Sequence, residues 1–173
     1  MQKVLAIIGA RPQFIKHAPV ELELQKEFEL VTIHTGQHYD DNMSKVFFDE
    51  LKISKPEYIL DLGGYSHGKQ TGMMMMQIED IVTKQKPDAI LVYGDTNSTL
   101  AGALVGAKLH IPVFHIEAGL RSYNKSMPEE INRVLADHVS DMFFIPSEAA
   151  RKNLENEGIY DNIFNVGDVM YDM

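Results

Sequence analysis

The feature that most constrains the fold of this chain is the alternation of apolar, strand-like runs with helix-like segments from one end to the other. Residues 3–9 (KVLAIIG) form a continuous apolar run, which is typical of a strand covered on both faces of a sheet. Weaker runs of the same kind predict strands at 30–34, 89–93, 111–116, 142–145 and 163–166. The stretch 56–62 allows one more short strand.

Helical patterns fill the intervals between these runs, and we expect helices over 13–27, 41–52, 68–85, 97–109, 129–139 and 147–156. Pro12 and Pro128 fit a first helical turn, where a missing N–H is tolerated, and Ser147 is a plausible N-cap. Strands that alternate with helices predict βαβ units with right-handed crossovers. We therefore expect an α/β, Rossmann-like fold with a parallel sheet, in which the 173 residues form one domain.

Composition narrows the class of protein further. A formal charge of −9 argues against a general nucleic-acid binder, although a few local cations can still hold a phosphorylated small molecule. The absence of cysteine excludes disulfides, thiolate metal sites and a cysteine nucleophile. Apolar runs fall short of the roughly 20 residues that span a bilayer, and the first run is too short for a signal peptide. We expect a cytoplasmic protein with no membrane and no nucleic-acid partner.

Polar residues gather after several of the predicted strands, where open parallel sheets bind their ligands. Arg11 and Lys16 follow the first strand and suit an anion site at a helix N-terminus, although a solvated first turn explains them equally simply. The spacing matches neither a P-loop nor a dinucleotide-binding turn. Gln37 and His38 follow the second strand, in a glycine turn that could equally be a hydrogen-bonded loop.

Carboxylates follow the later strands. Asp95 follows the run 89–93 closely, and either Asp95 or Thr96 could simply cap the next helix. Glu117 ends the run 111–116, with Arg121 as a candidate structural partner. Glu129 opens a helix, and Arg133, four residues on, suits an ordinary surface ion pair.

The convergence of these groups favours a site over separate structural roles. Three carboxylates beside three cations can move protons and hold an anionic leaving group. No histidine and glutamate spacing suggests zinc, and no nucleophile elbow suggests acyl transfer, so we predict neither a metal nor a cofactor. The four consecutive methionines 73–76 on a predicted helix are compatible with a homodimer contact.

Five loop segments together resemble the non-hydrolysing UDP-N-acetylglucosamine 2-epimerase family. They are GARPQFIK (9–16), TGQHYD (35–40), YGDTNST (93–99), HIEAGLR (115–121) and PEEINR (128–133). Each segment alone is weak, but all five occur in the family's order. The resemblance covers the chain from residue 3 to about 172, and its last part resembles the point where the family's first domain gives way to its second.

The resemblance implies the GT-B architecture, with two Rossmann-like domains and the active site in the cleft between them. Residues 1–173 would then form the N-terminal domain, and we expect this chain alone to be inactive because a C-terminal domain is missing. The family interconverts UDP-GlcNAc and UDP-ManNAc by eliminating UDP to a 2-acetamidoglucal and adding it back. Carried over by position, Asp95, Glu117 and Glu129 match its catalytic carboxylates.

The resemblance also places substrate-binding residues at Arg11, Lys16, Gln37, His38 and Arg133, with a UDP-sugar as the substrate. The identity of the sugar stays open, because the wording of segments 37–40 and 67–72 also resembles relatives that act on UDP-diacetamido sugar acids. The type of activity stays open as well. A hydrolysing epimerase would release UDP and ManNAc from a similar fold, and a non-catalytic domain would only bind a nucleotide sugar.

Overall fold

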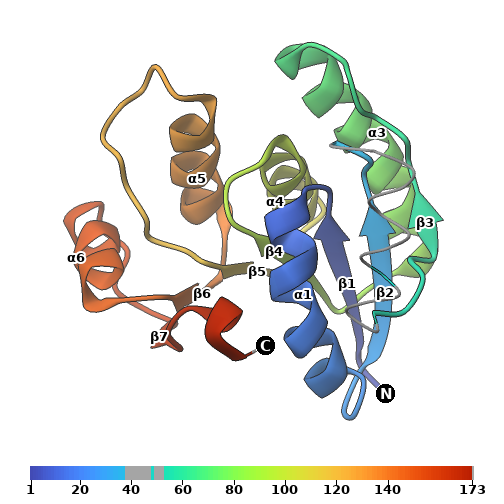
Figure 1. Ribbon diagram of the computed structural model, residues 1–173, viewed down its shortest axis with the longest axis horizontal. Coiled ribbons are helices and arrows are strands. Elements are labelled where there is room, and N and C mark those ends of the chain that lie inside the picture. Colours follow the sequence, from blue (N-terminus) through green and yellow to red (C-terminus); the bar gives the residue numbers. More distant parts are fainter. Residues whose placement is uncertain (38–47, 49–52, 173) are drawn as a thin grey trace.

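The computed structural model describes residues 1–37, 48 and 53–172, which form a seven-stranded sheet with helices on both faces (Figure 1). The strands are β1 (Lys3–Ile8), β2 (Glu29–His34), β3 (Tyr58–Ile59), β4 (Ala89–Tyr93), β5 (Val113–Ile116), β6 (Met142–Ile145) and β7 (Ile163–Asn165). The helices are α1 (Arg11–Leu24), α3 (His67–Gln85), α4 (Asn97–Lys108), α5 (Pro128–Val139) and α6 (Glu148–Asn156), followed by the 3₁₀ turn η1 (Val169–Asp172).

The expected parallel sheet is confirmed, since every pair of neighbouring strands runs parallel. Each predicted strand is present within a few residues, and the stretch 56–62 contributes the two-residue strand β3. Five of the six predicted helices are present, and α5 begins at Pro128 as expected. The predicted helix 41–52 lies outside the described residues apart from Phe48, which is helical.

Strand order fixes where a ligand can bind. The order is β3-β2-β1-β4-β5-β6-β7, so the chain first moves outward from β1 and then returns to add β4 on the other side of it. This is the doubly wound arrangement, in which the crevice outside the carboxyl ends of the strands opens at the reversal point. The reversal here lies between β1 and β4, and the loops after these strands border the expected site.

The two faces of the sheet differ in how completely they are covered. On one face, α3, α4 and α5 pack on alternate strand residues such as Leu5 and Ile7. On the other face, α1 packs on Val4, Ala6 and Ile8. Beside α1 an apolar groove of about 940 Å³ remains, lined in part by Leu24, Leu91, Phe114, Phe144 and Val169.

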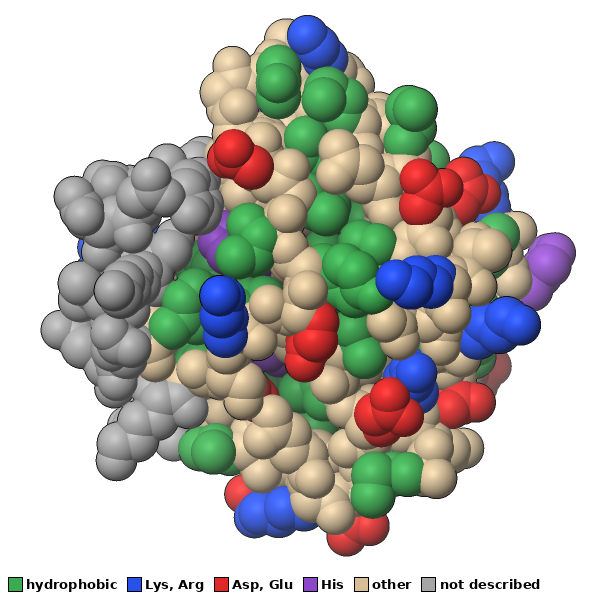
Figure 2. All heavy atoms as spheres, turned by 90° about the vertical axis from the view of Figure 1, so that its right-hand side faces the viewer, with side chains coloured by type: hydrophobic (Ala, Val, Ile, Leu, Met, Phe, Trp, Pro, Cys, Tyr) green, Lys and Arg blue, Asp and Glu red, His purple; other side chains and the backbone are tan. Residues whose placement is uncertain are grey.

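The surface on the α3 and β3 side carries charges of both signs, scattered among hydrophobic and polar side chains (Figure 2). The described helices are all too short or too polar to cross a lipid bilayer.

Candidate active site

The loops after β1 and β4 are joined by one glutamine. The Gln13 side-chain oxygen accepts hydrogen bonds from the backbone N–H groups of Gly9 (2.8 Å) and Ala10 (3.0 Å). Its amide group donates to the carbonyl of Tyr93 at the end of β4 (2.7 Å). Gln13 therefore fixes the two loops at the reversal point, although the sequence singled out only its neighbours Arg11 and Lys16. Its position three residues after Ala10, the N-cap of α1, is a signal that could have identified it.

Gly9 allows a third loop to approach the same point. A Cβ atom at Gly9 would lie 2.1 Å from Thr35 Oγ1 and 2.4 Å from Ser98 Oγ, so only glycine fits. The predicted binding residue Gln37 lies here, and its side-chain oxygen accepts from the backbone N–H (3.0 Å) and the hydroxyl (2.7 Å) of Ser98. His38, predicted beside it, lies outside the described residues.

Lys16 and Glu117 form an ion pair across the loops after β1 and β5. Lys16 is 6% exposed, and Glu117 is half-buried. Burial lowers the pKa of Lys16, while the carboxylates of Asp168 and Asp95 oppose the shift. The sequence had suggested Arg121 as the structural partner of Glu117, and that interpretation is wrong.

Glu117 also has an unusual backbone conformation, with φ at 67° in the left-handed region. For a residue with a side chain this conformation costs about 1–3 kcal/mol and persists where the surrounding structure enforces it. Two backbone hydrogen bonds hold the segment, because the N–H groups of Glu117 (3.0 Å) and Ala118 (3.2 Å) both donate to the Phe144 carbonyl on β6. The strain turns the carboxylate back toward β4, where it would lie 3.7 Å from a Cβ atom at Gly94.

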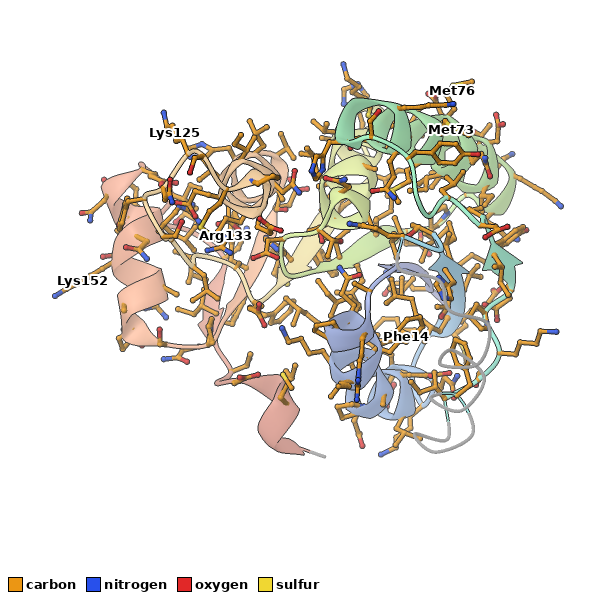
Figure 3. All side chains as sticks on the ribbon, turned by 45° about the horizontal axis from the view of Figure 1, so that its top comes forward. Phe14, Met73, Met76, Lys125, Arg133 and Lys152 are labelled. Carbon is orange, nitrogen blue, oxygen red and sulfur yellow. The ribbon has the colours of Figure 1, made fainter. Side chains whose placement is uncertain are left out.

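Asp95 and Arg133 form a second ion pair, between the loop after β4 and helix α5. Both side chains are largely buried, at 25% and 15% exposed. The structure excludes Asp95 as the cap of α4, since Thr96 is the N-cap and accepts from the Thr99 N–H (3.3 Å). In Figure 3, Arg133 lies within the fold while Lys125 and Lys152 extend away from it. The two pairs Lys16–Glu117 and Asp95–Arg133 are called the edge pairs below.

Glu129 and Glu130 differ sharply although they are adjacent. The predicted carboxylate Glu129 is exposed at the start of α5, whereas Glu130 is 2% exposed. Glu130 accepts from the backbone N–H groups of Ser122 (2.9 Å) and Tyr123 (2.8 Å), which outweigh its burial and lower its pKa. The expected surface pair of Glu129 with Arg133 does not form, because Arg133 contacts Glu130 (3.3 Å) and Asp95 instead.

Amide side chains beneath the edge pairs were not identified from the sequence. Asn132 on α5 donates to the backbone carbonyl of Asp95 (3.0 Å) and to the Asn97 side chain on α4 (3.1 Å). Asn97 in turn donates to Gln70 on α3 (2.9 Å). These bonds connect three helix N-termini around the loop that carries Asp95, through contacts between distant positions that no local pattern reveals.

Five of the predicted site residues lie on loops or helix ends that meet at the reversal point: Lys16, Gln37, Asp95, Glu117 and Arg133. Arg11 is exposed at the start of α1, beside the same crevice, and Glu129 is exposed at the start of α5. Within the described residues, no group of three or more metal-ligating side chains could hold a metal ion. Two carboxylates paired with two cations at the carboxyl ends of the strands can exchange protons with a substrate and bind its anionic groups.

Comparison with known proteins identifies the family. The family profile described as UDP-N-acetylglucosamine 2-epimerase matches residues 20–173. The chain belongs to the UDP-N-acetylglucosamine 2-epimerase family. The match covers four of the five segments, from 35–40 to 128–133, and the resemblance is confirmed at the level of family.

Curated epimerase relatives match nearly the whole chain. It is 62% identical, over 98% of its length, to a UDP-N-acetylglucosamine 2-epimerase homolog of Methanococcus maripaludis, of which it covers 48%. It is 57% identical, again over 98% of its length, to UDP-2,3-diacetamido-2,3-dideoxy-D-glucuronate 2-epimerase of Pseudomonas aeruginosa, of which it covers 49%. The chain thus spans about half the length of the curated relatives it matches.

Solved epimerase structures share the fold. The UDP-GlcNAc 2-epimerase of Methanocaldococcus jannaschii, crystallised with UDP-GlcNAc and UDP, superposes with a TM-score of 0.94 at 51% identity. The match covers 96% of this chain and 47% of that structure. The expected Rossmann-like fold is therefore confirmed, and this chain matches about half the length of that epimerase.

Proposed function

We propose that the protein to which this domain belongs is a UDP-sugar 2-epimerase that interconverts UDP-GlcNAc and UDP-ManNAc. The observation that carries the proposal is the convergence of the two edge pairs at the reversal point between β1 and β4. There, carboxylates and cations lie within one loop cluster of a family member. An epimerase needs both, because it moves a proton and releases a diphosphate.

The proposed reaction has two balanced steps. A base removes the proton from C2 of the sugar as the bond from C1 to the UDP oxygen breaks, which gives UDP and a 2-acetamidoglucal. UDP then adds back to C1 while an acid returns a proton to C2 from the opposite face. Asp95, Glu117 and Glu129 are the proposed acid and base groups, and Lys16 and Arg133 are proposed to stabilise the departing diphosphate.

Several residues are proposed to bind the substrate rather than react with it. Arg11 stands at the N-terminus of α1, where its own charge and the positive end of the helix dipole favour a phosphate. Gln37 lies on the loop after β2, and His38 follows it. No cofactor enters this scheme, because the electrons of the broken C–H and C–O bonds remain within the two products.

A second, C-terminal domain is proposed to complete the cleft. Residues 1–173 would form the N-terminal domain, and we expect them to be inactive alone because half of the contacts to the nucleotide would be absent. The half-length match to the curated relatives supports this proposal. A cytoplasmic location and a homodimer are further proposals. Met76, 69% exposed on the outer side of α3, is compatible with a subunit contact (Figure 3).

One alternative substrate is supported by a specific observation. The 57% identity to the epimerase of UDP-2,3-diacetamido-2,3-dideoxy-D-glucuronate makes that nucleotide sugar a second candidate. The reaction would be the same inversion at C2, with a carboxylate and an additional acetamido group on the sugar. The residues proposed to act at C1 and C2 would keep their roles.

The test is to incubate the full-length protein with each nucleotide sugar in D₂O and follow the products by NMR. Intact epimer with deuterium at C2 supports the proposal and identifies the substrate. Free ManNAc with UDP would indicate a hydrolysing epimerase. Tight binding of UDP without turnover of either sugar would favour a non-catalytic nucleotide-sugar-binding domain.

A further inference from the structure

A buried ionic network lies directly beneath the edge pairs. It consists of His115 on β5, Asp137 on α5, Arg121 in the loop between these elements, and Glu157 after α6. The side chains of His115 and Asp137 are completely buried, and that of Arg121 is 1% exposed. None of these three can touch a substrate, so any effect on chemistry must pass through the backbone that they hold.

His115 holds the turn that carries Asp95. Its Nε2 lies 2.7 Å from the carbonyl oxygen of Gly94, and its Nδ1 lies 2.7 Å from Asp137 Oδ1. A carbonyl and a carboxylate both accept hydrogen bonds, so both contacts are satisfied when the imidazole carries a proton on each nitrogen.

Asp137 holds the segment that carries Glu117. Its second oxygen accepts from the backbone N–H of Gly119 (3.0 Å) and from Arg121 (2.7 Å). Burial disfavours its charge, but the charge and hydrogen bond of His115, together with Arg121, hold its pKa below the ordinary value. Gly119 must be glycine, because its φ is 80° and a Cβ atom would lie 2.6 Å from the Ala150 carbonyl oxygen.

We propose that His115 is a positioning residue for the epimerase reaction, which sets the relative placement of Asp95 and Glu117 through the Gly94 carbonyl and Asp137. The inference rests on the proposed function for its kinetic consequences. The contacts themselves do not depend on that function. One buried imidazole is hydrogen-bonded to the turn before Asp95 and to the carboxylate that orders the segment after Glu117. A misplacement of about 1 Å between reacting groups costs about 100-fold in rate.

Two substitutions in the full-length protein separate the two bonds. His115→Gln places its amide N–H near the Nε2 position and keeps the bond to Gly94, whereas His115→Asn places it near Nδ1 and keeps only the bond to Asp137. We expect kcat to fall about 100-fold in H115N, with KM within about threefold of wild type, and less than tenfold in H115Q. His17→Gln is the matched control, because His17 is equally buried but hydrogen-bonded to Tyr93 (2.8 Å) under α1.

Crystal structures of the two variants give a readout that does not depend on activity. We expect the peptide between Gly94 and Asp95 to be displaced in H115N and retained in H115Q. An undisplaced turn in H115N, or equal kcat in both variants, would overturn the inference. Loss of thermal stability in both variants with unchanged kcat would also overturn it, since that is the mark of a purely structural residue. If the wild-type protein turns over neither nucleotide sugar, the proposed function fails, and the displacement of the turn alone decides the positioning role.

Discussion

The edge pairs and the buried ionic network are made of the same kinds of residue, yet they can do different things. Lys16–Glu117 and Asp95–Arg133 lie at the carboxyl ends of the strands, and each includes a carboxylate that is more than 20% exposed. In the buried ionic network, His115, Asp137 and Arg121 are at most 1% exposed. The difference is solvent exposure, because a carboxylate can exchange a proton with a substrate only if the substrate can reach it.

Burial also changes the energetic consequence of losing a partner. A buried ion pair contributes little net stability, but removing one member leaves an uncompensated charge that costs about 3–5 kcal/mol. The partly exposed carboxylates Asp95 and Glu117 can become hydrated when a partner is lost, so a ligand can rearrange the edge pairs at a lower cost. The comparison predicts that substitutions in the edge pairs change turnover, whereas substitution of Arg121 in the buried ionic network changes stability.

The largest expected effect is the loss of turnover on neutralising an edge carboxylate. Asp95→Asn or Glu117→Gln in the full-length protein removes a proposed acid or base, and we expect kcat to fall by about 10³-fold or more. Steady-state assays with the nucleotide sugar that the wild type accepts measure this effect. The melting temperature of D95N should stay within a few degrees of wild type, because Asp95 and Arg133 are both partly exposed. E117Q leaves the buried Lys16 unpaired, so some loss of stability should accompany its loss of turnover.

The matched control is Glu79→Gln, at an exposed position on α3 far along the chain from the site. It removes the same charge without touching an edge pair, and turnover should be unaffected. Near-normal kcat in D95N or E117Q would remove that residue from the mechanism.

The next effect in size is a loss of stability on breaking the buried ionic network. Arg121 donates to Asp137 and, through two nitrogens, to Glu157 (2.8 and 2.6 Å). Burial by itself lowers the pKa of Arg121, but these carboxylates outweigh it and raise the pKa above its usual value. We expect Arg121→Met to lower the free energy of unfolding by about 3–5 kcal/mol, as measured by urea denaturation.

Arg151→Gln serves as the comparison for this change. Arg151 pairs with Glu148 (3.2 Å), whose side chain is 70% exposed, and its loss should cost less than about 1 kcal/mol. Equal losses in the two variants would contradict the distinction between buried and exposed pairs.

The third prediction concerns the pH dependence of stability at His17, a buried histidine whose hydrogen-bond partners are neutral hydroxyl groups. His17 contacts the hydroxyl groups of Tyr93 (2.8 Å) and Thr32 (3.3 Å), and burial lowers its pKa from 6.5 to about 4. Between these pH values the unfolded chain binds a proton that the folded chain excludes, so stability is retained above pH 6.5 and falls as the pH drops toward 4. The expected loss from this residue is about 3 kcal/mol.

The measurement is the free energy of unfolding at pH 7 and at pH 4 for wild type and His17→Gln. The variant should lose less stability over this interval, by about 3 kcal/mol. His34, whose pKa burial also lowers to about 4, acts in both proteins and cancels in the difference. An equal loss of stability between pH 7 and pH 4 in both proteins would show that folded His17 does not exclude the proton.

The smallest expected effect concerns the cap of α4. Thr96→Ala removes the oxygen that accepts from the Thr99 N–H, and we expect a loss of about 1 kcal/mol in the free energy of unfolding. Thr96→Ser keeps that oxygen and should restore most of the loss. If Thr96→Ala left the free energy of unfolding unchanged, the assignment of the cap to Thr96 would be wrong.

The sequence predicted the fold well because local patterns carried the necessary information. The run 89–93 is apolar on both faces, and β4 occupies the same residues. Gly36, Gly94 and Gly119 come just after three of the predicted strands, and each lies in a turn with positive φ (73°, 63° and 80°). Such features depend on a residue and its close neighbours along the chain.

The site was predicted as a set of loops, but its pairings were not. Arg121 was a candidate structural partner for Glu117, which is paired instead with Lys16, 101 positions away along the chain. The spacing of Glu129 and Arg133 also allowed a surface ion pair, but the adjacent Glu130 contacts Arg133 because its carboxylate turns inward to the backbone of Ser122 and Tyr123. Spacing along a helix predicts which side chains can meet, but it does not include competitors from elsewhere in the fold.

The sequence by itself therefore determined the class of fold, the family and the loops that form the candidate site. Only the tertiary structure decided that the reversal of strand order falls between β1 and β4, and which ions face which. It also decided that His115 is a buried contact of the Asp95 turn rather than a site residue. The physical reason is that secondary structure follows from local periodicity, whereas ion pairing and burial depend on which strands become neighbours.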